Sequence, residues 1–316
     1  MGRAFVHVPI LLEACMDMLA VRPGGTYVDG TLGGGGHTEG MLRCSGPDGR
    51  VLGIDRDGDA IVAASQRLAP FGQRFQAVRG NFHDIKAILD GQAVDGILLD
   101  LGVSSYQLDE PSRGFSYQQD APLDMRMDRS AALTAMEVVN GYGETELARI
   151  IREYGEERYA GRIAGRIVQA RARQPIRTTG ELAELIKQAI PAAQRRQGPH
   201  PAKRTFQALR IEVNDELAPL AAALEDAVEC LKPGGRLAVI TFHSLEDRIA
   251  KQTFRRLANP CTCPPDWPVC TCGRRPVVRE LTRRAAEPTE REVEENPRSR
   301  SARLRAVEKC SIDQGV

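Results

Sequence analysis

Residues 26–40 read TYVDGTLGGGGHTEG, and this stretch decides the fold. A short apolar run that ends in an acidic residue and a glycine (26–30) leads into four consecutive glycines and then into a plausible helix through Met41 and Leu42. The order strand, tight turn, helix is typical of the first unit of a parallel α/β sheet. Glycine lets the backbone of such a turn approach a ligand, and the N-terminus of the following helix presents unpaired N–H groups.

The alternation of strand and helix continues along the chain. We expect further strands at VLGID (51–55), FQAVR (75–79), VDGILLD (94–100) and, much later, RLAVITF (236–242). This pattern favours a doubly wound, mainly parallel α/β sheet whose ligand lies beyond the carboxyl ends of the strands. Residues 144–190 show only helical periodicity. We therefore predict an α/β domain of residues 1–105 and 205–316, interrupted by a helical insertion domain at 106–204.

The C-terminal part carries weaker signals. Residues 206–231 predict one helical stretch closed by the segment LKPGG (231–235). After the Cys/Pro-rich segment 259–276, the charge-rich tail predicts mostly irregular structure.

The composition is that of an ordinary globular protein of 316 residues, with 42% hydrophobic and 27% charged residues. It excludes a wholly disordered or fibrous chain. No stretch approaches the roughly 18 uninterrupted apolar residues of a membrane span, and the N-terminal apolar run lacks signal-peptide architecture. We therefore expect a cytoplasmic protein with no membrane partner. Isolated cysteines such as Cys15, Cys44 and Cys230 agree with a reducing compartment.

The glycine turn and one acidic residue favour a cofactor site. Asp55 ends the second predicted strand roughly 20 positions after Gly33, where an acid can accept both ribose hydroxyls of an adenosine. In the alternative, the glycines form a flexible loop and Asp55 caps a helix; the strand before each feature favours the cofactor site. The turn DGTLGGGG (29–36) departs from G-x-G-x-x-G and resembles the D-x-x-x-G-x-G pattern of class I (Rossmann-like) methyltransferases. S-adenosylmethionine has no pyrophosphate to cradle, which fits a different turn.

Motifs along nearly the whole chain make the resemblance specific. They are TLGGGGHTEG (31–40), GIDRD (53–57), GNF (80–82), LLDLGVSSYQLD (98–109), RGFSY (113–117), PLDMRMD (122–128), FQALRIEVNDEL (206–217), LKPGGRL (231–237), TFHSLEDR (241–248) and NPRSRSARLR (296–305). Together they resemble the ribosomal RNA small subunit methyltransferase H family, the MraW-like 16S rRNA cytosine-N4 methyltransferases. The resemblance implies S-adenosylmethionine-dependent methylation of N4 of a cytidine in the decoding region of 16S rRNA. It also implies that the partner is this RNA or the small ribosomal subunit.

The resemblance further implies which residues contact the cofactor. They are Gly35, Gly36, His37, Asp55, Phe82, Asp100 and Gln107. Their chemistry agrees: Phe82 offers a face for adenine, Asp100 can approach the methionyl ammonium, and Gln107 can hydrogen-bond a polar edge. Taken singly, Phe82 is equally typical of a core, His37 of a cap or packed histidine, and Asp100 of a helix cap.

The reaction places a demand on the site. Direct displacement needs the acceptor held in line with the methyl group, and the lone pair of the cytosine N4 amine is delocalised into the ring. A hydrogen-bond acceptor at N4 therefore helps. Many amino-group methyltransferases use a D/N/S-P-P-aromatic motif after the fourth strand, where this chain has DLGVSS (100–105). The candidates are Asp100, Ser104 or Ser105, Asn214 and His243; for His243 a structural bond to backbone is an equal alternative.

Positive charge is concentrated in one segment, although the net charge of the chain is only +1. Residues 158–210 contain twelve Lys or Arg and two Glu, an excess that favours RNA phosphates over a solvated surface. Arg158, Arg162 and Arg166 recur at four-residue spacing and are expected on one helical face. Arg195 and Arg196, beside a Pro/Gly-rich loop, could extend this surface, and the NPRSRSARLR tail is a second candidate.

The segment CTCPPDWPVCTC sets Cys261 and Cys263 against Cys270 and Cys272. Its C-x-C pairs are tighter than the usual C-x2–4-C spacing of zinc ligands. The sequence therefore favours reduced thiols in a Pro-constrained loop and no metal, with a zinc site as the alternative.

Three rival functions fit parts of the pattern. A nicotinamide-dependent oxidoreductase would also use Asp55, a small-molecule or protein methyltransferase would share the cofactor, and a non-enzymatic RNA-binding protein would share the basic segment. The oxidoreductase would bind NAD, the second rival would be insensitive to salt and to the arginines, and the third would consume no cofactor. A homodimer is compatible with the sequence.

Overall fold

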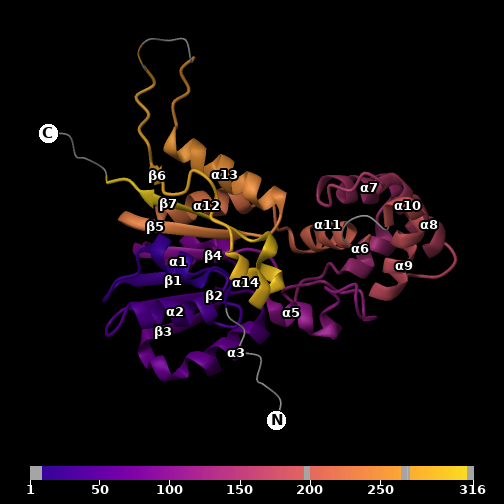
Figure 1. Ribbon diagram of the computed structural model, residues 1–316, viewed down its shortest axis with the longest axis horizontal. Coiled ribbons are helices and arrows are strands. Elements are labelled where there is room, and N and C mark those ends of the chain that lie inside the picture. The colour runs from indigo at the N-terminus through magenta and orange to yellow at the C-terminus, as the bar shows by residue number, and fades with distance from the viewer. Residues whose placement is uncertain (1–8, 196–199, 265–268, 270, 312–316) are drawn as a thin grey trace. The chain divides into compact units, whose positions relative to one another are not determined.

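The computed structural model describes residues 9–195, 200–264, 269 and 271–311 (Figure 1). The chain divides into two compact units, Met1–Gly102 with Ala218–Val316, and Val103–Leu217. We call the first the sheet unit and the second the helical unit. The chain thus leaves the sheet unit after its fourth strand and returns to it before the fifth.

One sheet organises the sheet unit. Among the described residues it has seven strands in the order β3-β2-β1-β4-β5-β7-β6. They are β1 (Thr26–Asp29), β2 (Arg50–Asp55), β3 (Phe75–Arg79), β4 (Val94–Asp100), β5 (Leu231–Thr241), β6 (Val278–Glu280) and β7 (Arg303–Lys309). Strands β1 to β5 are parallel, and β7 is antiparallel to both β5 and β6. The predicted mainly parallel α/β sheet is confirmed.

Helices pack on both faces of the sheet, because successive strand residues point to opposite sides. Ile97 and Leu99 of β4 belong to one hydrophobic cluster, and Leu98 between them belongs to another. The first cluster includes residues of α4 (Ile85–Leu89), α12 (Leu220–Glu229) and α13 (Ser244–Ala258). The second includes residues of α1 (Leu12–Leu19), α2 (Gly36–Cys44) and α3 (Gly58–Leu68). Burial on both sides explains why β4 is almost continuously apolar.

Two boundaries differ from the sequence prediction. Strand β5 begins at Leu231, so LKPGG is part of the strand and does not close a helix. The expected single helix over 206–231 is two helices, α11 (Lys203–Asn214) and α12. Asp215, at the C-terminus of α11, adopts a left-handed conformation (φ 47°), which ends the helix there.

The expectation of an irregular C-terminal tail is wrong. The tail contains β6, α14 (Glu290–Glu295) and β7, and β7 joins β5 and β6 in the sheet. Leu304 and Val307 of β7 are buried, and the Arg305 guanidinium donates to both oxygens of the Asp247 carboxylate, at 2.7 and 3.0 Å. The charged sequence RLRAVEK did not indicate a buried strand. It forms one because Arg305 has a buried partner, Asp247, on α13.

The helical unit is built on a single hydrophobic core. Its helices are α5 (Ser105–Asp109), α6 (Ala135–Gly141), α7 (Glu144–Glu153), α8 (Ala160–Arg171), α9 (Thr179–Ala189), α10 (Ala192–Arg195) and α11. Ile150 and Ile151 of α7 pack in this core with Ile163 and Ile167 of α8, at the spacing of a buried helical face.

Short 3-10 segments occur in both units: η1 (Ala69–Arg74), η2 (Phe82–Asp84) and η4 (Pro297–Ser301) in the sheet unit, and η3 (Pro111–Arg113) in the helical unit. Within the described residues, no helix has the length and apolar character to cross a membrane.

Candidate functional site

Three carboxylates mark the carboxyl edge of the sheet. Asp29, Asp55 and Asp100 are the last residues of β1, β2 and β4. These strands are parallel and adjacent, with Asp29 in register with Gly53 on one side and Leu98 on the other. The edge is therefore acidic where a doubly wound sheet binds its ligand.

Asp55 holds the glycine turn. Its Oδ2 accepts a hydrogen bond from the Gly33 N–H at 2.8 Å, and its Oδ1 accepts one from the Asp57 N–H at 2.8 Å. Burial raises the pKa of Asp55 despite these two bonds. The residue that caps α3 is Asp57, whose carboxylate accepts from the Asp59 N–H. Each oxygen of Asp55 keeps a second lone pair, so a pair of ribose hydroxyls could still be bound.

The glycine turn needs glycine at two positions. Gly35 precedes α2 with φ 75°, a left-handed conformation that other residues adopt only with strain. At Gly36 a Cβ atom would lie 2.4 Å from the Cγ atom of Pro9, so the Pro9 ring leaves no room for a side chain. The turn thus brings bare backbone to the edge where Asp55 ends its strand.

His37 links this turn to Asp100. Its Nε2 lies 2.9 Å from the carbonyl oxygen of Ile10, and its Nδ1 lies 3.7 Å from Oδ2 of Asp100. The ring is buried, with its side chain 8% exposed. His37 is thus a packed histidine that also faces the Asp100 carboxylate, and its contact with the cofactor stays a prediction.

Asp100 is a third carboxylate of the edge whose pKa is raised. Burial raises its pKa to about 6, opposed by the neighbouring His37 and reinforced by the charges of Asp29 and Glu246. The side chain is 26% exposed, yet its Oδ1 is buried and makes no hydrogen bond within the described chain. A buried carboxylate oxygen without a donor is costly, so the fold holds this carboxylate against a desolvation penalty.

Two acidic residues near Asp100 were missing from the predicted site. Asp29 is buried, and it accepts from the Thr38 hydroxyl at 2.7 Å and from the Thr31 N–H at 3.2 Å. Its signal was the acid that opens DGTLGGGG. Glu246 is buried at the start of α13 and raises the pKa of Asp100. Its signal was an acid three residues after His243, the spacing of a capping box.

Phe82 lies beside the glycine turn. It begins η2 directly after β3, and a Cβ atom at Gly30 would lie 3.1 Å from the Cβ atom of Phe82. Its ring meets the His83 ring edge to face, with 4.4 Å between centroids. Phe82 is partly buried against the core, so it is neither a fully packed core residue nor a free aromatic. The residue as a whole is therefore half-buried.

The other candidates for the acceptor have structural bonds. Asn214 is buried; its Oδ1 accepts from the Met127 N–H, and its Nδ2 donates to the carbonyls of Met125 and Arg210, all at 2.8 to 2.9 Å. His243 caps α13, with Nδ1 3.4 Å from the Glu246 nitrogen. The structure therefore shows the backbone bond that the sequence allowed for His243.

Ser104 and Gln107 form a capping box at α5 in the helical unit. The Ser104 hydroxyl accepts from the Gln107 N–H at 3.2 Å, and the Gln107 Oε1 accepts from the Ser104 N–H at 3.1 Å. Ser105 is the first residue of α5, and Gln107 is buried. The DLGVSS segment thus ends in a helix start fixed by its own side chains.

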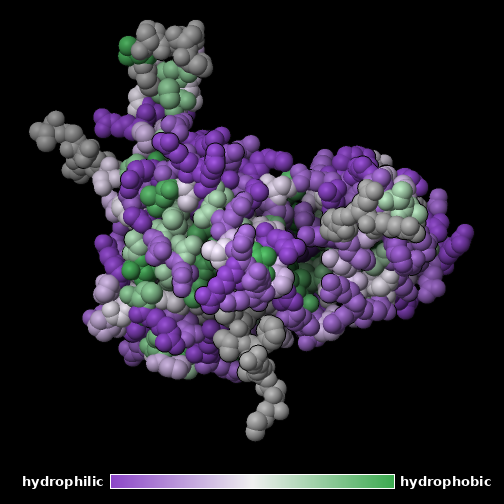
Figure 2. All heavy atoms as spheres, in the orientation of Figure 1, coloured by the Kyte–Doolittle hydropathy of each residue, from purple (hydrophilic) through white to green (hydrophobic). Residues whose placement is uncertain are grey.

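The arginine triplet, Arg158, Arg162 and Arg166, lies at the surface of the helical unit. Only Arg162 and Arg166 stand on α8; Arg158 precedes the helix, against the expectation of one shared helical face. The Arg158 guanidinium lies over the Tyr159 ring, 4.7 Å from its centroid, and Arg162 lies 6.0 Å from the same ring. All three arginines are exposed, and none forms an ion pair within the described residues. Hydrophilic residues cover most of the visible surface over α8 and α9 (Figure 2).

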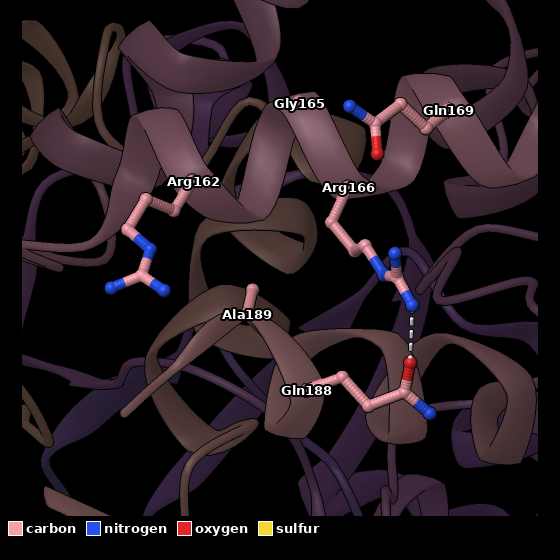
Figure 3. Close-up of a pocket in the computed structure, with 6 residues that line it drawn as sticks. All are labelled: Arg162, Gly165, Arg166, Gln169, Gln188 and Ala189. Atoms are coloured by element: carbon pink, nitrogen blue, oxygen red, sulfur yellow. Dashed lines mark hydrogen bonds between the residues drawn. The ribbon is translucent and has the colours of Figure 1, made fainter. Parts of the chain in front are cut away.

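A pocket of about 470 Å³ lies between α8 and α9 (Figure 3). It is lined by Arg162, Gly165, Arg166, Gln169, Gln188 and Ala189. Arg166 donates to Oε1 of Gln188 at 2.8 Å, which fixes one guanidinium at the pocket. A polar pocket with two cations at its wall is suited to an anionic group.

The rest of the basic segment is mixed. Arg195 ends α10, and Arg196 lies outside the described residues. Arg171 donates to the carbonyls of Val139 and Tyr142, and Arg210 forms a two-bond ion pair with Glu216. Part of the positive excess therefore stabilises the fold and is not available to a partner.

The cysteine segment brings sulfurs together. The Sγ atoms of Cys261, Cys263 and Cys272 all lie within 4.8 Å of one another. Cys270 lies outside the described residues.

Known proteins resemble this chain over almost its whole length. The profile of the MraW methylase family matches residues 4–310. The chain belongs to the MraW methylase family. Relatives in the family include the ribosomal RNA small subunit methyltransferase H of Symbiobacterium thermophilum, 61% identical over 98% of this chain and 99% of the relative. That of Heliobacterium modesticaldum is 56% identical over 96% of this chain and 99% of the relative.

Membership of the MraW methylase family makes the protein a methyltransferase and confirms the resemblance found in the motifs. A solved structure, an rRNA methylase from Streptococcus thermophilus, aligns with a TM-score of 0.41 at 13% identity over 98% of this chain and 100% of that one. That likeness is too distant to add to the assignment. The match to a methylase family spans both units of the chain. It therefore argues against the two rival functions of an oxidoreductase and a non-enzymatic RNA-binding protein.

Proposed function

We propose that this chain transfers a methyl group from S-adenosylmethionine to N4 of a cytidine in the decoding region of small-subunit ribosomal RNA. The observation that carries the cofactor part is the row of Asp29, Asp55 and Asp100 at the carboxyl ends of β1, β2 and β4, with Asp55 bonded to the glycine turn. The RNA part is supported by relatives at 61% and 56% identity that are small-subunit ribosomal RNA methyltransferases. The cytidine N4 position comes from the resemblance of the motifs.

The carboxyl edge of the sheet fits this cofactor. The free lone pairs of Asp55 would accept the ribose hydroxyls, the Gly35 and Gly36 turn would lie against the ligand, and Phe82 would cover the adenine. The Asp100 carboxylate, whose side chain is 26% exposed, would accept from the methionyl ammonium, and His37 Nδ1 lies 3.7 Å from its Oδ2. S-adenosylmethionine, when bound, would supply a methyl group on a sulfonium sulfur. A nucleophile attacks the methyl carbon directly, and the sulfur leaves as a thioether.

The chain's own residues then have two tasks. Asp100 and Asp55 orient the donor, because a charged hydrogen bond at each end of the ligand fixes its position. Asp100 must be ionised for this, and a pKa of about 6 leaves it so at neutral pH. Asn214 and His243 act as structural residues that keep the 122–128 loop and α13 in place.

The helical unit supplies the RNA contacts. Its arginine triplet and the pocket between α8 and α9 carry cations with no acidic partner among the described residues, which suits phosphates. Stacking of Arg158 on Tyr159 also presents a flat surface of the kind that splayed RNA bases use.

One experiment tests the whole proposal. The purified protein is incubated with methyl-labelled S-adenosylmethionine and small ribosomal subunits that lack their native modifications, and the RNA nucleosides are analysed by mass. Label on cytidine N4 is expected, and Asp100→Asn should abolish it while Asp48→Asn, in an exposed loop, should not. Label on another nucleoside would refute the N4 assignment, and cofactor binding without label in RNA would refute the substrate.

A further inference from the structure

The segment between α13 and β6 has no regular secondary structure in its described part. It rises from the sheet unit as two extended arms (Figure 1, orange). Its base is anchored by the Val277 N–H, which donates to the Leu257 carbonyl at 2.9 Å, and by the Cys310 N–H, which donates to the Val277 carbonyl at 2.9 Å. Above this base, few apolar side chains are buried. Burial alone does not explain an ordered arrangement of its cysteines.

The sulfur atoms nevertheless converge across the two arms. Cys261 and Cys263 come from the first arm and Cys272 from the second, and their Sγ atoms lie within 4.8 Å of one another. The Sγ atoms of Cys261 and Cys272 are 3.8 Å apart. This is too long for a disulfide, whose sulfurs are about 2.0 Å apart. Two thiolates each about 2.3 Å from a tetrahedral zinc ion stand about 3.8 Å apart, which is the separation seen.

We propose that Cys261, Cys263 and Cys272 are ligands of a structural Zn²⁺ ion that ties the two arms together. Thiolate sulfurs are preferred ligands of Zn²⁺. A hard cation such as Mg²⁺ prefers oxygen ligands, so three sulfurs favour zinc over magnesium. A structural zinc site takes four ligands, so one further ligand would complete the coordination beside these three. The proposal is independent of the proposed methyl transfer, because none of its residues belongs to the carboxyl edge of the sheet.

The surroundings of Cys263 match those of a zinc thiolate. The Thr271 N–H donates to the Cys263 Sγ at 3.4 Å, and the Thr271 hydroxyl lies 3.7 Å from the same sulfur. Hydrogen bonds of this kind orient a ligand and favour its charged form. The C-x-C pairs are closer in sequence than the usual C-x2–4-C zinc ligands. Cys272, however, comes from the facing arm, where sequence spacing imposes no limit on the distance between ligands.

The test is metal content. The full chain is produced in zinc-supplemented medium and purified with a thiol reductant, and bound zinc is measured by mass spectrometry. We expect about one zinc per chain in the wild type and in the control Cys44→Ser, which alters an exposed cysteine of α2, and at least a tenfold loss in Cys261→Ser/Cys272→Ser. A wild type without zinc, or a double variant that retains it, would overturn the proposal.

Two further measurements keep the result clear if the double variant folds poorly. Cobalt(II) added to the metal-stripped wild type should give thiolate charge-transfer bands and the intense visible bands of a tetrahedral ion; their absence overturns the proposal without any variant. Trypsin should cut slowly between the exposed Arg274 and Arg275 in the zinc-loaded protein, and at least tenfold faster after chelation. A cleavage rate unaffected by chelation contradicts the closing of the arms by metal.

Discussion

Replacing Asp100 by Asn should stabilise the unliganded protein while weakening its binding of S-adenosylmethionine. The pKa of Asp100 rises from its ordinary 3.8 to about 6, chiefly because the carboxylate is buried. That difference corresponds to about 3 kcal/mol of folding free energy that the ionised carboxylate costs. Asn has nearly the same shape and no charge, so the variant avoids this cost.

The sign of the pH dependence follows from the same pKa. The folded protein holds the Asp100 proton more tightly than the unfolded chain does, so the contribution to the free energy of unfolding is present below about pH 4. It is lost as the pH rises through about 6. The Asn variant does not titrate, and its advantage over the wild type should therefore be near zero at pH 4 and approach about 3 kcal/mol above pH 7.

Urea unfolding of both unliganded proteins at pH 4.5 and pH 7.5 measures this difference. Other titrating groups are common to the two proteins and cancel in the comparison. Cofactor affinity, measured by calorimetry at pH 7.5, should fall at least tenfold in Asp100→Asn and stay unchanged in Asp48→Asn. An equal stability difference at both pH values, or a variant that is less stable at pH 7.5, would refute the reasoning about the buried charge.

Three other substitutions test separate parts of the molecule. Asp55→Ala should weaken S-adenosylmethionine binding by on the order of 1–3 kcal/mol through loss of charged hydrogen bonds, and unchanged calorimetric affinity would place the ribose elsewhere. Replacing the arginine triplet by Gln should lower affinity for small-subunit RNA and flatten its dependence on salt; an unaltered slope would mean that the three side chains are only solvated. Asp247→Asn should lower the free energy of unfolding by about 3 kcal/mol, because it leaves the Arg305 guanidinium buried without its charge partner. Thermal unfolding at pH 7.5 with Arg303→Gln as a control checks this, since Arg303 is half exposed and lies 3.5 Å from the same carboxylate.

The sequence predicted the parallel part of the sheet well because its central strands, β1 and β4, are buried on both faces. A strand such as β4 must then be apolar at nearly every position, and this pattern needs no knowledge of its neighbours. Strand β7 could not be found in the same way. Its burial depends on Asp247, which lies more than fifty positions earlier in the chain and neutralises Arg305 inside the protein. Pairings of this range are invisible to a pattern of local polarity.

The site shows the same division. Asp55 could be placed from its position after a strand and a glycine turn, and the structure gives it the bonds to that turn. Asn214 and His243 carry chemistry-bearing side chains, but their partners come from the 122–128 loop and from the first turn of α13. Whether a side chain already forms hydrogen bonds within the folded protein depends on its tertiary structure. The sequence could therefore name these candidates but not the structural bonds that they also make, and their role in the reaction stays a prediction.

Three buried carboxylates that are unfavourable to ionise lie together at the carboxyl edge of the sheet. Burial raises the pKa values of Asp29, Asp55 and Asp100, and the charge of Asp29 makes ionisation of the other two less favourable. Such an arrangement destabilises an unliganded protein, and a fold selected for stability alone would replace at least one of the three. A ligand that carries both a sulfonium and an ammonium reverses the balance, because its positive charges meet carboxylates that are already desolvated. The proposed cofactor thus explains why the acids are retained, and it predicts that S-adenosylmethionine stabilises the wild type more than it stabilises Asp100→Asn.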